Sequence, residues 1–513
     1  MKLLSILLVM GFTFLSCANE SKRDEMNILL ITVDDMNWNS VGVFGCNIPD
    51  ITPNIDRLAE SGMRFEHAYV QASNCSPSRC VLQAGRYPHQ TGMRGFYYVE
   101  VENETLPEVL KHNGYITGII NKVADNSLSP DFQKYWDFTG EFTGAQRRSS
   151  TVYGEQLVSF LNNVNTGSKP FYCVINIADP HKPFFNDEQS IERGFDRFEP
   201  SHIFTLDDVE IPGFLPEAPQ IKQEVLNYYN SVKRADDCVG AVLDVLNKSK
   251  YSENTMVFFI SDHGMPMPFA KSSVYQHGIR TPWIVSCPGV IKSGRVDSEH
   301  LISSIDFLPT ILDFIDIEVP SGIEGKSMVP LLKGAGTEPT ECVFAQFDEN
   351  AGGIPNPSRT VINKKYGYIF NAWATGQRRF KSAAEYHTTY GIMNGMATSD
   401  VEVQKRFNHW VYRSVEELYD YENDPDALHN LIDDPAYQEV ANQLRASLER
   451  QMIKTDDYIL PAFQHRNDPD YLNDWMQKQD EEAILRSQNL QWKRYKNRSG
   501  LTKENTGLFN VTE

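Results

Sequence analysis

The sequence predicts an α/β fold in which helices flank a central, mostly parallel β-sheet. Apolar residues predominate in 27–33, 171–177 and 255–260. Such runs lack the alternation of a half-exposed strand and are typical of strands buried on both faces of a parallel sheet. Apolar side chains spaced three to four residues apart across 225–247 predict a helix between two of these strands. This order of elements indicates an α/β domain.

The composition is that of an ordinary globular protein large enough for two domains. The 513 residues are 41% hydrophobic and 23% charged, and their formal net charge is −20. This charge argues against a nucleic-acid partner. It would also repel a polyanionic substrate, whose site would then need clustered basic residues. Arg147-Arg148 and Arg378-Arg379 with Lys381 are candidates, although such pairs more often lie on a solvated surface.

Residues 1–16 have the pattern of an export signal. A basic second residue precedes the apolar run 3–15, which is too short to remain as a membrane span. The run ends in Phe14-Leu15-Ser16-Cys17, which resembles a bacterial lipobox. We therefore expect cleavage before Cys17, a lipid anchor on its sulfur and a polar tether over 17–25. An ordinary secretory signal is the alternative. The lipobox predicts an exported lipoprotein of a bacterial cell envelope, in the periplasm or at the outer membrane.

The eight cysteines show neither the paired spacing of a zinc site nor a disulfide framework. Cys173 and Cys287 lie in apolar runs, and we expect both to be buried thiols. Export would permit disulfides, but the spacing specifies none.

Two adjacent carboxylates, Asp34 and Asp35, follow the first apolar run. Carboxylates at the end of a buried strand are costly unless a positive charge neutralises them. A divalent cation that prefers oxygen ligands would do so, and the two residues are therefore candidate metal ligands. The alternative is a pair of solvated loop acids.

The stretch 74–85 combines a small nucleophile precursor with the start of a helix. Pro77 fits the first turn of a helix, so Cys75 would lie just before it, next to free backbone N–H groups and the positive end of the helix dipole. Arg79, about one turn further on, could turn its guanidinium toward the same place. Such a pair suits a tetrahedral oxyanion such as sulfate or phosphate. The alternative is a small buried cysteine with a surface arginine.

Polar residues also follow the other predicted strands. Lys122 ends a short strand over 115–122, His181 follows the second apolar run, and Asp262 with His263 follows the third. A lone lysine or histidine at such a place is more often structural than functional. Ligands of open α/β sheets, however, collect beyond the carboxyl ends of the strands. Four separate segments that deliver polar groups to one edge therefore predict a site there.

The residues Cys75-Ser76-Pro77-Ser78-Arg79 match the signature Cys-x-Pro-Ser-Arg, and the chain resembles the type I, formylglycine-dependent sulfatases of the alkaline phosphatase superfamily. The resemblance covers residues 26–460. It is closest to the branch that contains sulfamidase, the heparan N-sulfatase, on the stretches 262–268, 412–413 and 417–420. That branch also includes bacterial enzymes for algal polysaccharides such as ulvan.

This resemblance implies the chemistry of the site. Cys75 would be converted to formylglycine (3-oxoalanine) by a separate formylglycine-generating enzyme, and the hydrated aldehyde would be the nucleophile. The implied ligands of a Ca²⁺ ion, or of Mg²⁺, are Asp34, Asp35, Cys75, Asp262 and His263. The implied catalytic residues are Cys75, Arg79, Lys122, His181 and Lys271. His277 and Arg280 are candidate substrate-binding residues, and for each of them a role without substrate contact is an equal alternative.

Two positions depart from the family element Gly-Lys-x-His around Lys122. Asn121 replaces the glycine, and Ala124 replaces the histidine that in the family contacts the leaving group. For this reason the resemblance does not transfer the identity of the substrate to this chain.

We expect a catalytic domain over 26–340, a C-terminal subdomain over 341–462 and a tail, 463–513, without an assigned role. For the subdomain the family implies a four-stranded antiparallel sheet and one long helix, which 436–455 would supply. Within the catalytic domain, 187–224 is expected to be a long loop over the site. The segments 52–62 and 106–110 have the pattern of short structural helices.

The expected function is hydrolysis of sulfate groups on a sulfated polysaccharide or its oligosaccharides. The lipoprotein signal and Ala124 favour an algal polysaccharide of the ulvan type, and a heparan N-sulfatase is the alternative. A phosphomonoester or phosphonate hydrolase on the same fold is a further hypothesis, although the lysines and the signature favour sulfate. The last hypothesis is a surface lipoprotein that only binds glycans, against which the intact nucleophile and metal residues argue.

Overall fold

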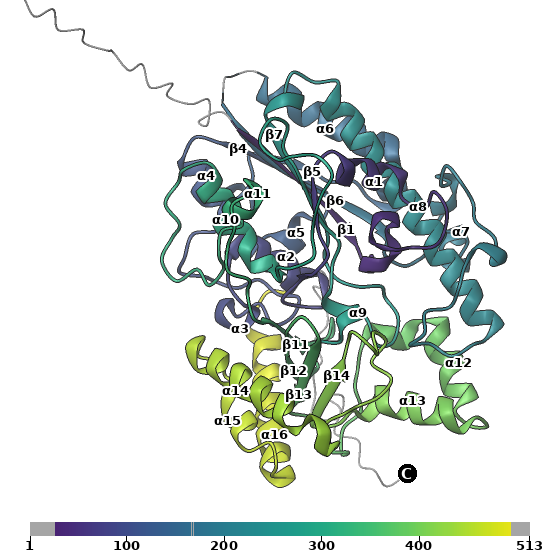
Figure 1. Cartoon of the computed structure of the whole chain (residues 1–513). Coiled ribbons are helices and arrows are strands. Elements are labelled where there is room, and N and C mark those ends of the chain that lie inside the picture. Colours follow the sequence, from purple (N-terminus) through teal and green to yellow (C-terminus); the bar gives the residue numbers. More distant parts are fainter. Residues whose placement is uncertain (1–25, 166, 168, 494–513) are drawn as a thin grey trace, which may run out of the picture.

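The computed structural model describes residues 26–493 except 166 and 168 (Figure 1). The expected signal peptide 1–16, the tether with Cys17 and the tail beyond 493 lie outside the described residues. Among the helices of the described part, none combines the length and the apolar character needed to cross a bilayer.

A large sheet forms the centre of the molecule, as predicted. Over the described residues it has eight strands in the order β5-β4-β6-β1-β7-β8-β2-β9. The strands from β5 to β7 in this order are parallel, and β8 runs antiparallel to both of its neighbours. The strands are β1 (Asn27–Asp34), β2 (Met63–Phe65), β4 (Ile116–Ile120), β5 (Phe138–Gly140), β6 (Phe171–Pro180), β7 (Thr255–Ser261), β8 (Trp283–Ser286) and β9 (Arg295–Asp297).

Helices cover both faces of this sheet (Figure 1). On one face, α1 (Pro53–Glu60), α6 (Ser150–Val164) and α8 (Pro219–Asn247) share a core with Leu29, Ile31 and Val33 of β1. The second core contains Ile28 and Leu30, with residues of α4 (Leu106–His112), α10 (Phe307–Phe314) and α11 (Val329–Leu332). Successive residues of β1 thus enter different cores, which explains why its sequence is apolar without alternation.

The register of the sheet brings the carboxyl ends of the central strands together. Asp34 of β1 lies opposite Pro180 of β6, and Val33 lies opposite Ser261 of β7. The residues that follow these three strands therefore meet at one edge. The prediction that ligands gather at this edge rests on this alignment.

Helix α8 is longer than the sequence suggested. It begins at Pro219 rather than at 225, with Ala218 as its N-terminal cap residue. Proline is favoured at the first helical position, whereas the polar residues 222–224 obscured the apolar spacing. The expected loop 187–224 therefore ends at 218, and it contains the short helix α7 (Glu188–Glu192).

The second sheet is antiparallel with four strands, as expected for the C-terminal subdomain. Its strands, in spatial order, are β11 (Val343–Glu349), β12 (Pro355–Ile362), β13 (Tyr366–Asn371) and β14 (Glu416–Asp420). Helix α14 (Gln438–Lys454) confirms the predicted long helix. The expectation of a single helix was incomplete, because the chain also forms α12 (Thr388–Met396), α13 (Val401–Tyr412), α15 (Leu460–Gln464) and α16 (Pro469–Asn489).

Smaller elements join these layers. They are α2 (Cys75–Ala84), α3 (Pro88–Thr91), α5 (Val123–Asn126), α9 (Gln276–Ile279) and the strand pair β3 (Ala68–Tyr69) with β10 (Ile302–Ser303). The seven cysteines of the described part are free thiols, and Cys173 and Cys287 are fully buried as predicted.

Candidate active site

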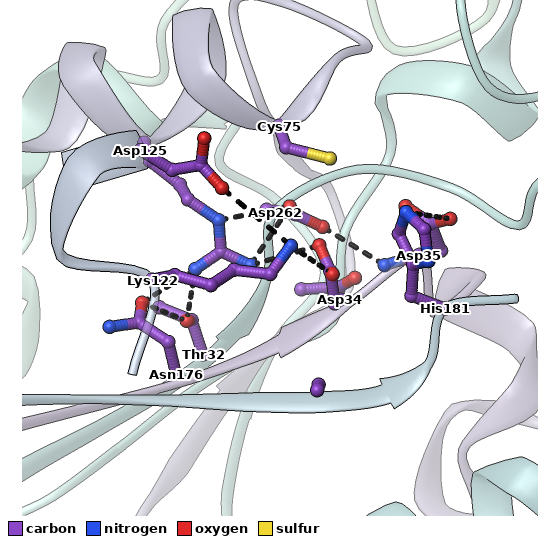
Figure 2. Close-up of polar contacts among 12 residues, drawn as sticks. Thr32, Asp34, Asp35, Cys75, Lys122, Asp125, Asn176, His181 and Asp262 are labelled. Atoms are coloured by element: carbon purple, nitrogen blue, oxygen red, sulfur yellow. Dashed lines mark hydrogen bonds and ion pairs between the residues drawn. The ribbon is translucent and has the colours of Figure 1, made fainter. Parts of the chain in front are cut away.

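The predicted metal-binding and catalytic residues meet at the carboxyl edge of the large sheet (Figure 2). Asp34 and Asp35 come from the end of β1, and Asp262 and His263 from the end of β7. These four residues have at most 1% exposure. Lys122 reaches the same place from the turn between β4 and α5, and His181 from the loop after β6. Side chains that are far apart in the sequence thus form one polar cluster, as predicted, and it is buried except at His181, whose side chain is 33% exposed.

Cys75 opens helix α2 above this cluster. Its predecessor Asn74 is extended, with φ −142° and ψ 148°, so Cys75 is the first helical residue rather than the residue before the helix. Gly85 ends the helix with φ 62°, a left-handed conformation that suits glycine. The first backbone N–H groups of a helix have no partner within it. Their position and the helix dipole favour an anion beside Cys75.

Arg79 lies one turn further along α2 and is fully buried. Its Nε and Nη2 bind Asp262 Oδ2 at 3.1 and 2.9 Å, and Nη2 binds Asp34 Oδ1 at 3.1 Å. The surface position considered for this arginine is therefore wrong. Its guanidinium faces the carboxylates, so Arg79 fixes the positions of two candidate metal ligands.

Two further polar residues complete the contacts of Arg79, and the sequence analysis missed both. Nη1 donates to Thr32 Oγ1 and to Asn176 Oδ1, each at 2.6 Å. Thr32 lies within β1 and Asn176 within β6, and both are fully buried. A polar residue inside an otherwise apolar, doubly buried strand was the signal that could have identified them.

Positive charges balance the carboxylates. Lys271 Nζ lies 2.7 Å from both oxygens of Asp35, and Lys122 forms an ion pair with Asp34. Burial alone would raise the pKa of Asp34, but Lys122, His181 and Arg79 hold it well below its usual range. Burial would also raise the pKa of Asp35, but the nearby positive charges, chiefly Lys271, outweigh it, and the pKa of Asp35 is lowered. Both carboxylates are therefore ionised at neutral pH.

The thiol of Cys75 is not activated. Burial raises its pKa to about 12, although Lys271 opposes the shift. Its Sγ lies 3.4 Å from His263 Nε2 and 3.7 Å from Lys271 Nζ. Because the thiolate is the nucleophilic form, an unmodified Cys75 would react poorly at neutral pH.

The donor set fits a hard divalent cation. One ligand atom from each of Asp35, Cys75, Asp262 and His263 lies within 4.8 Å of the others, and the same holds for Asp34, Cys75 and His181. The backbone N–H of Asp35 donates to Asp262 Oδ1 at 3.0 Å and so orients that carboxylate. Three carboxylates and one imidazole offer the oxygen-rich ligands that Ca²⁺ and Mg²⁺ prefer.

His181 faces Asp35 across 3.9 Å through its Nε2. Its Nδ1 lies 2.6 Å from the carbonyl of Lys182, so Nδ1 carries the proton and Nε2 is the free acceptor. Burial lowers the pKa of His181 to about 4, against the opposing effect of Asp35. The imidazole is therefore neutral at neutral pH.

His277 and Arg280 make their polar contacts outside this cluster. The His277 ring binds Asn37 at 3.1 Å and Asp426 at 2.9 Å. Arg280 donates to the carbonyl of Glu66 at 3.0 and 2.5 Å, and its guanidinium stacks on Trp38. Their assignment as substrate-binding residues stays a prediction, without support from these contacts.

The basic pairs considered for the substrate have structural contacts. Arg148 Nη1 binds Asp179 at 2.6 Å, and Nη2 donates to the carbonyl of His181 at 2.8 Å, so Arg148 holds the loop that carries His181. Arg378 forms two hydrogen bonds with Asp480 of α16, at 2.7 and 2.6 Å. Neither arginine is free to receive a substrate.

The structure also shows the surroundings of Asn121 and Ala124, the two residues that depart from the family element around Lys122. Asn121, with φ 61°, donates to the carbonyl of Asn176 at 2.8 Å and thereby ties this turn to β6. Ala124 lies in α5 and is partly exposed. Its methyl group offers no proton donor, so the function of a histidine at this place is missing or is supplied by another residue.

The fold and the site define an α/β enzyme of the alkaline-phosphatase-like type, with a carboxylate cluster and a nucleophile helix at one sheet edge. The model of the sulfatase family matches residues 26–317. The chain therefore belongs to the sulfatase family, and it is a sulfuric ester hydrolase. A second model, described as the C-terminal region of N-sulphoglucosamine sulphohydrolase, matches residues 262–375.

Similar proteins act on sulfated saccharides. Human N-sulphoglucosamine sulphohydrolase is 29% identical over 84% of this chain and 90% of its own length. An ulvan-active sulfatase of Formosa agariphila is 26% identical over 90% of both chains. A solved structure in complex with its substrate D-glucosamine-2-N,6-O-disulfate is 19% identical, with a TM-score of 0.62 over 85% of this chain and 99% of that chain. This last likeness concerns the fold alone.

Replacement of Arg79 tests the buried charge cluster independently of activity. Arg79→Met leaves the carboxylates of Asp34 and Asp262 without their shared cation, and we expect the free energy of unfolding to fall by about 3–5 kcal/mol. The exposed Arg57 of α1 supplies the matched control, Arg57→Met, which should change it by less than about 0.5 kcal/mol. Urea denaturation measures both. Equal stability of the two variants would contradict the assigned role of Arg79.

Proposed function

We propose that this protein is an exported sulfatase that removes sulfate groups from a sulfated polysaccharide or its oligosaccharides. The observation that carries the proposal is the position of Cys75, at the start of α2 and within 4.8 Å of ligand atoms from Asp35, Asp262 and His263. A sulfate beside Cys75 would meet the free N–H groups of the helix and two lysines. The named activities of the similar proteins support a sulfated saccharide as the substrate.

Two groups would complete this site. Asp34, Asp35, Asp262 and His263 would hold Ca²⁺ or Mg²⁺, which when bound would polarise the sulfate. Cys75 would be converted to formylglycine by a maturation enzyme, and the hydrated aldehyde would supply a nucleophilic hydroxyl. The raised pKa of the Cys75 thiol argues against the unmodified thiolate as the nucleophile, because burial disfavours the charged form.

The residues of the chain have separate tasks in this mechanism. Lys122 and Lys271 would neutralise the charge that develops on the sulfate oxygens. Arg79 would keep Asp34 and Asp262 in place. The Nδ1 of His181 is engaged with a carbonyl, so Nε2 would take the proton that the attacking hydroxyl releases. It would then give this proton to the oxygen or nitrogen of the leaving group as the S–O or S–N bond breaks.

An algal polysaccharide of the ulvan type is our preferred substrate. The lipobox at Cys17 supports it, because a lipoprotein signal suits a bacterial envelope enzyme that degrades external polysaccharides. Ala124 also supports a change of specificity relative to sulfamidase. A heparan N-sulfatase is the alternative, favoured by the match of residues 262–375 to the sulphohydrolase C-terminal region.

Sulfate release from two polysaccharides distinguishes the alternatives. Protein with Cys75 conversion verified by mass spectrometry is incubated with ulvan and heparin oligosaccharides in parallel. We expect release from ulvan alone, whereas release from the N-sulfate of heparin alone would establish the alternative. The control variant, Cys75→Ala, should release none. If aryl phosphates were hydrolysed faster than aryl sulfates, the enzyme would be a phosphoester hydrolase instead.

Calcium removal tests the proposed metal site without a substrate. Ca²⁺ at about one hundred times its Kd should stabilise the chelator-treated protein by ~2.7 kcal/mol. Asp35→Asn should abolish this gain, because it removes one charged ligand. Asp50→Asn, at an exposed position, should retain the gain. Thermal denaturation with and without Ca²⁺ measures the effect, and an equal gain in Asp35→Asn would contradict the assignment.

The lipid anchor on Cys17 is testable by partition into detergent. Protein expressed with its signal in a bacterium should enter the detergent phase, since acyl chains on Cys17 supply the membrane affinity. Cys17→Ser should move it to the aqueous phase, and Cys46→Ser should not. Wild-type protein in the aqueous phase would support the ordinary secretory signal.

A further inference from the structure

The segment 490–493, within the tail without an assigned role, lies against residues 96–98, which follow helix α3. Tyr98 N–H donates to the carbonyl of Gln491 at 2.8 Å, and Lys493 N–H donates to the carbonyl of Phe96 at 3.0 Å. Tyr97 and Trp492 form an antiparallel bridge between these bonds. We call 490–493 the C-terminal strap. Its backbone is thus fixed in the way an added strand is fixed.

Two ion pairs and a hydrogen bond to Glu349 fix the end of α16, from which the strap continues. Arg486 binds Glu349 Oε1 at 2.7 Å, and Tyr97 donates to Glu349 Oε2 at 2.9 Å. Arg94 lies 3.9 Å from the same carboxylate. The carbonyl of Glu349 accepts from Asn74, the residue before Cys75, at 3.1 Å. The strap and the start of α2 are therefore held by one buried residue of β11.

The strap places the ammonium group of Lys493 on the first turn of α2. Lys493 Nζ donates to Ser76 Oγ at 2.7 Å and to Cys80 Sγ at 3.5 Å. The carbonyl of Asp125, next to Ala124, accepts from the same hydroxyl and thiol at 3.3 and 3.4 Å. Lys493 thus contacts the residue that follows Cys75, and both groups that it contacts also bind the carbonyl of the residue that follows Ala124.

The charge of Lys493 differs from that of the other cations around Cys75. Arg79, Lys122 and Lys271 are each paired with a carboxylate of the cluster. Within the described residues, no carboxylate lies within ion-pair distance of Lys493. Burial lowers the pKa of Lys493, and only Cys80 opposes the shift. The contacts of this partly buried cation are a hydroxyl, a thiol and the ring of Tyr98, whose centroid lies 5.5 Å from Nζ. None of them carries a full negative charge, so burial is costly and an anion would stabilise the ammonium group.

We propose that Lys493 of the C-terminal strap binds an anionic group, a carboxylate or a second sulfate, on the saccharide whose sulfate lies at Cys75. This proposal rests on the proposed function and names a specificity residue for it. The chain carries a net charge of −20, so a polyanion needs a local, uncompensated positive charge to bind. Lys493 supplies that charge next to the nucleophile.

Calorimetric binding to a Cys75→Ala background tests the proposal without turnover. The probes are uronate-containing sulfated oligosaccharides prepared from ulvan and from heparin. Lys493→Met should weaken binding of the preferred oligosaccharide by about tenfold, and Lys493→Arg should restore most of it. The difference between the two variants should shrink as salt is raised, because salt screens the interaction. The exposed Lys478 of α16 gives the matched control, Lys478→Met.

Turnover supplies a second measurement, in the Cys75 enzyme. In Lys493→Met, the ratio of kcat/KM for the oligosaccharide to kcat/KM for an aryl sulfate should fall about tenfold, because the aryl sulfate has no second anion. A purely structural role would lower both values and the melting temperature together and leave the ratio unchanged, which would overturn the proposal.

Three binding results would also overturn it: no binding of either oligosaccharide, equal affinities of Lys493→Met and Lys478→Met, or a loss in Lys493→Met that Lys493→Arg does not restore. If the oligosaccharide binds through Lys493 but no sulfate is released by the converted enzyme, the proposed function fails and the binding role of Lys493 stands. The two proposals are therefore separable.

Discussion

The ion pairs of Arg79 with Asp34 and Asp262 are the constraint on which the site depends. One guanidinium on α2 joins the ends of β1 and β7, and its third nitrogen reaches β6 through Asn176. Four elements are thereby fixed to one another by a single fully buried side chain. Because buried charges are costly unless they are paired, the arginine and the carboxylates can only be accommodated together.

The surrounding residues follow from the same requirement. Lysines from two other segments balance the remaining carboxylate charge, and Asn176 and Thr32 satisfy the donors that the carboxylates do not reach. The alignment of the three strands sets these distances, since a shift of one residue would move Asp34 or Asp262 to the other face of the sheet. The helix that carries Cys75 is therefore oriented by the sheet.

Much of the fold was predictable because its strands are buried on both faces. The continuous apolar runs identified β1, β6 and β7, and the polar residues after them identified the edge at which the site lies. Asn176 was not predicted as a site residue. A single polar residue in an apolar strand does not identify its partner until the pairing of the strands is known. The helices α12, α13 and α16 were missed because their buried faces are narrow; charged residues flank the buried faces of α13 and α16, whereas α12 contains two glycines. The contact of Lys493 with Ser76 was not predictable, since no local pattern links residues 417 positions apart.

That separation has a consequence for the order of events in synthesis. Residues 490–493 are translated long after Cys75, so the first turn of α2 has no strap over it while most of the chain is being made. If Cys75 is converted as proposed, the converting enzyme would have access to it before α16 and the strap associate with the catalytic domain. The place of the strap in the chain would then separate the maturation of the nucleophile from its use.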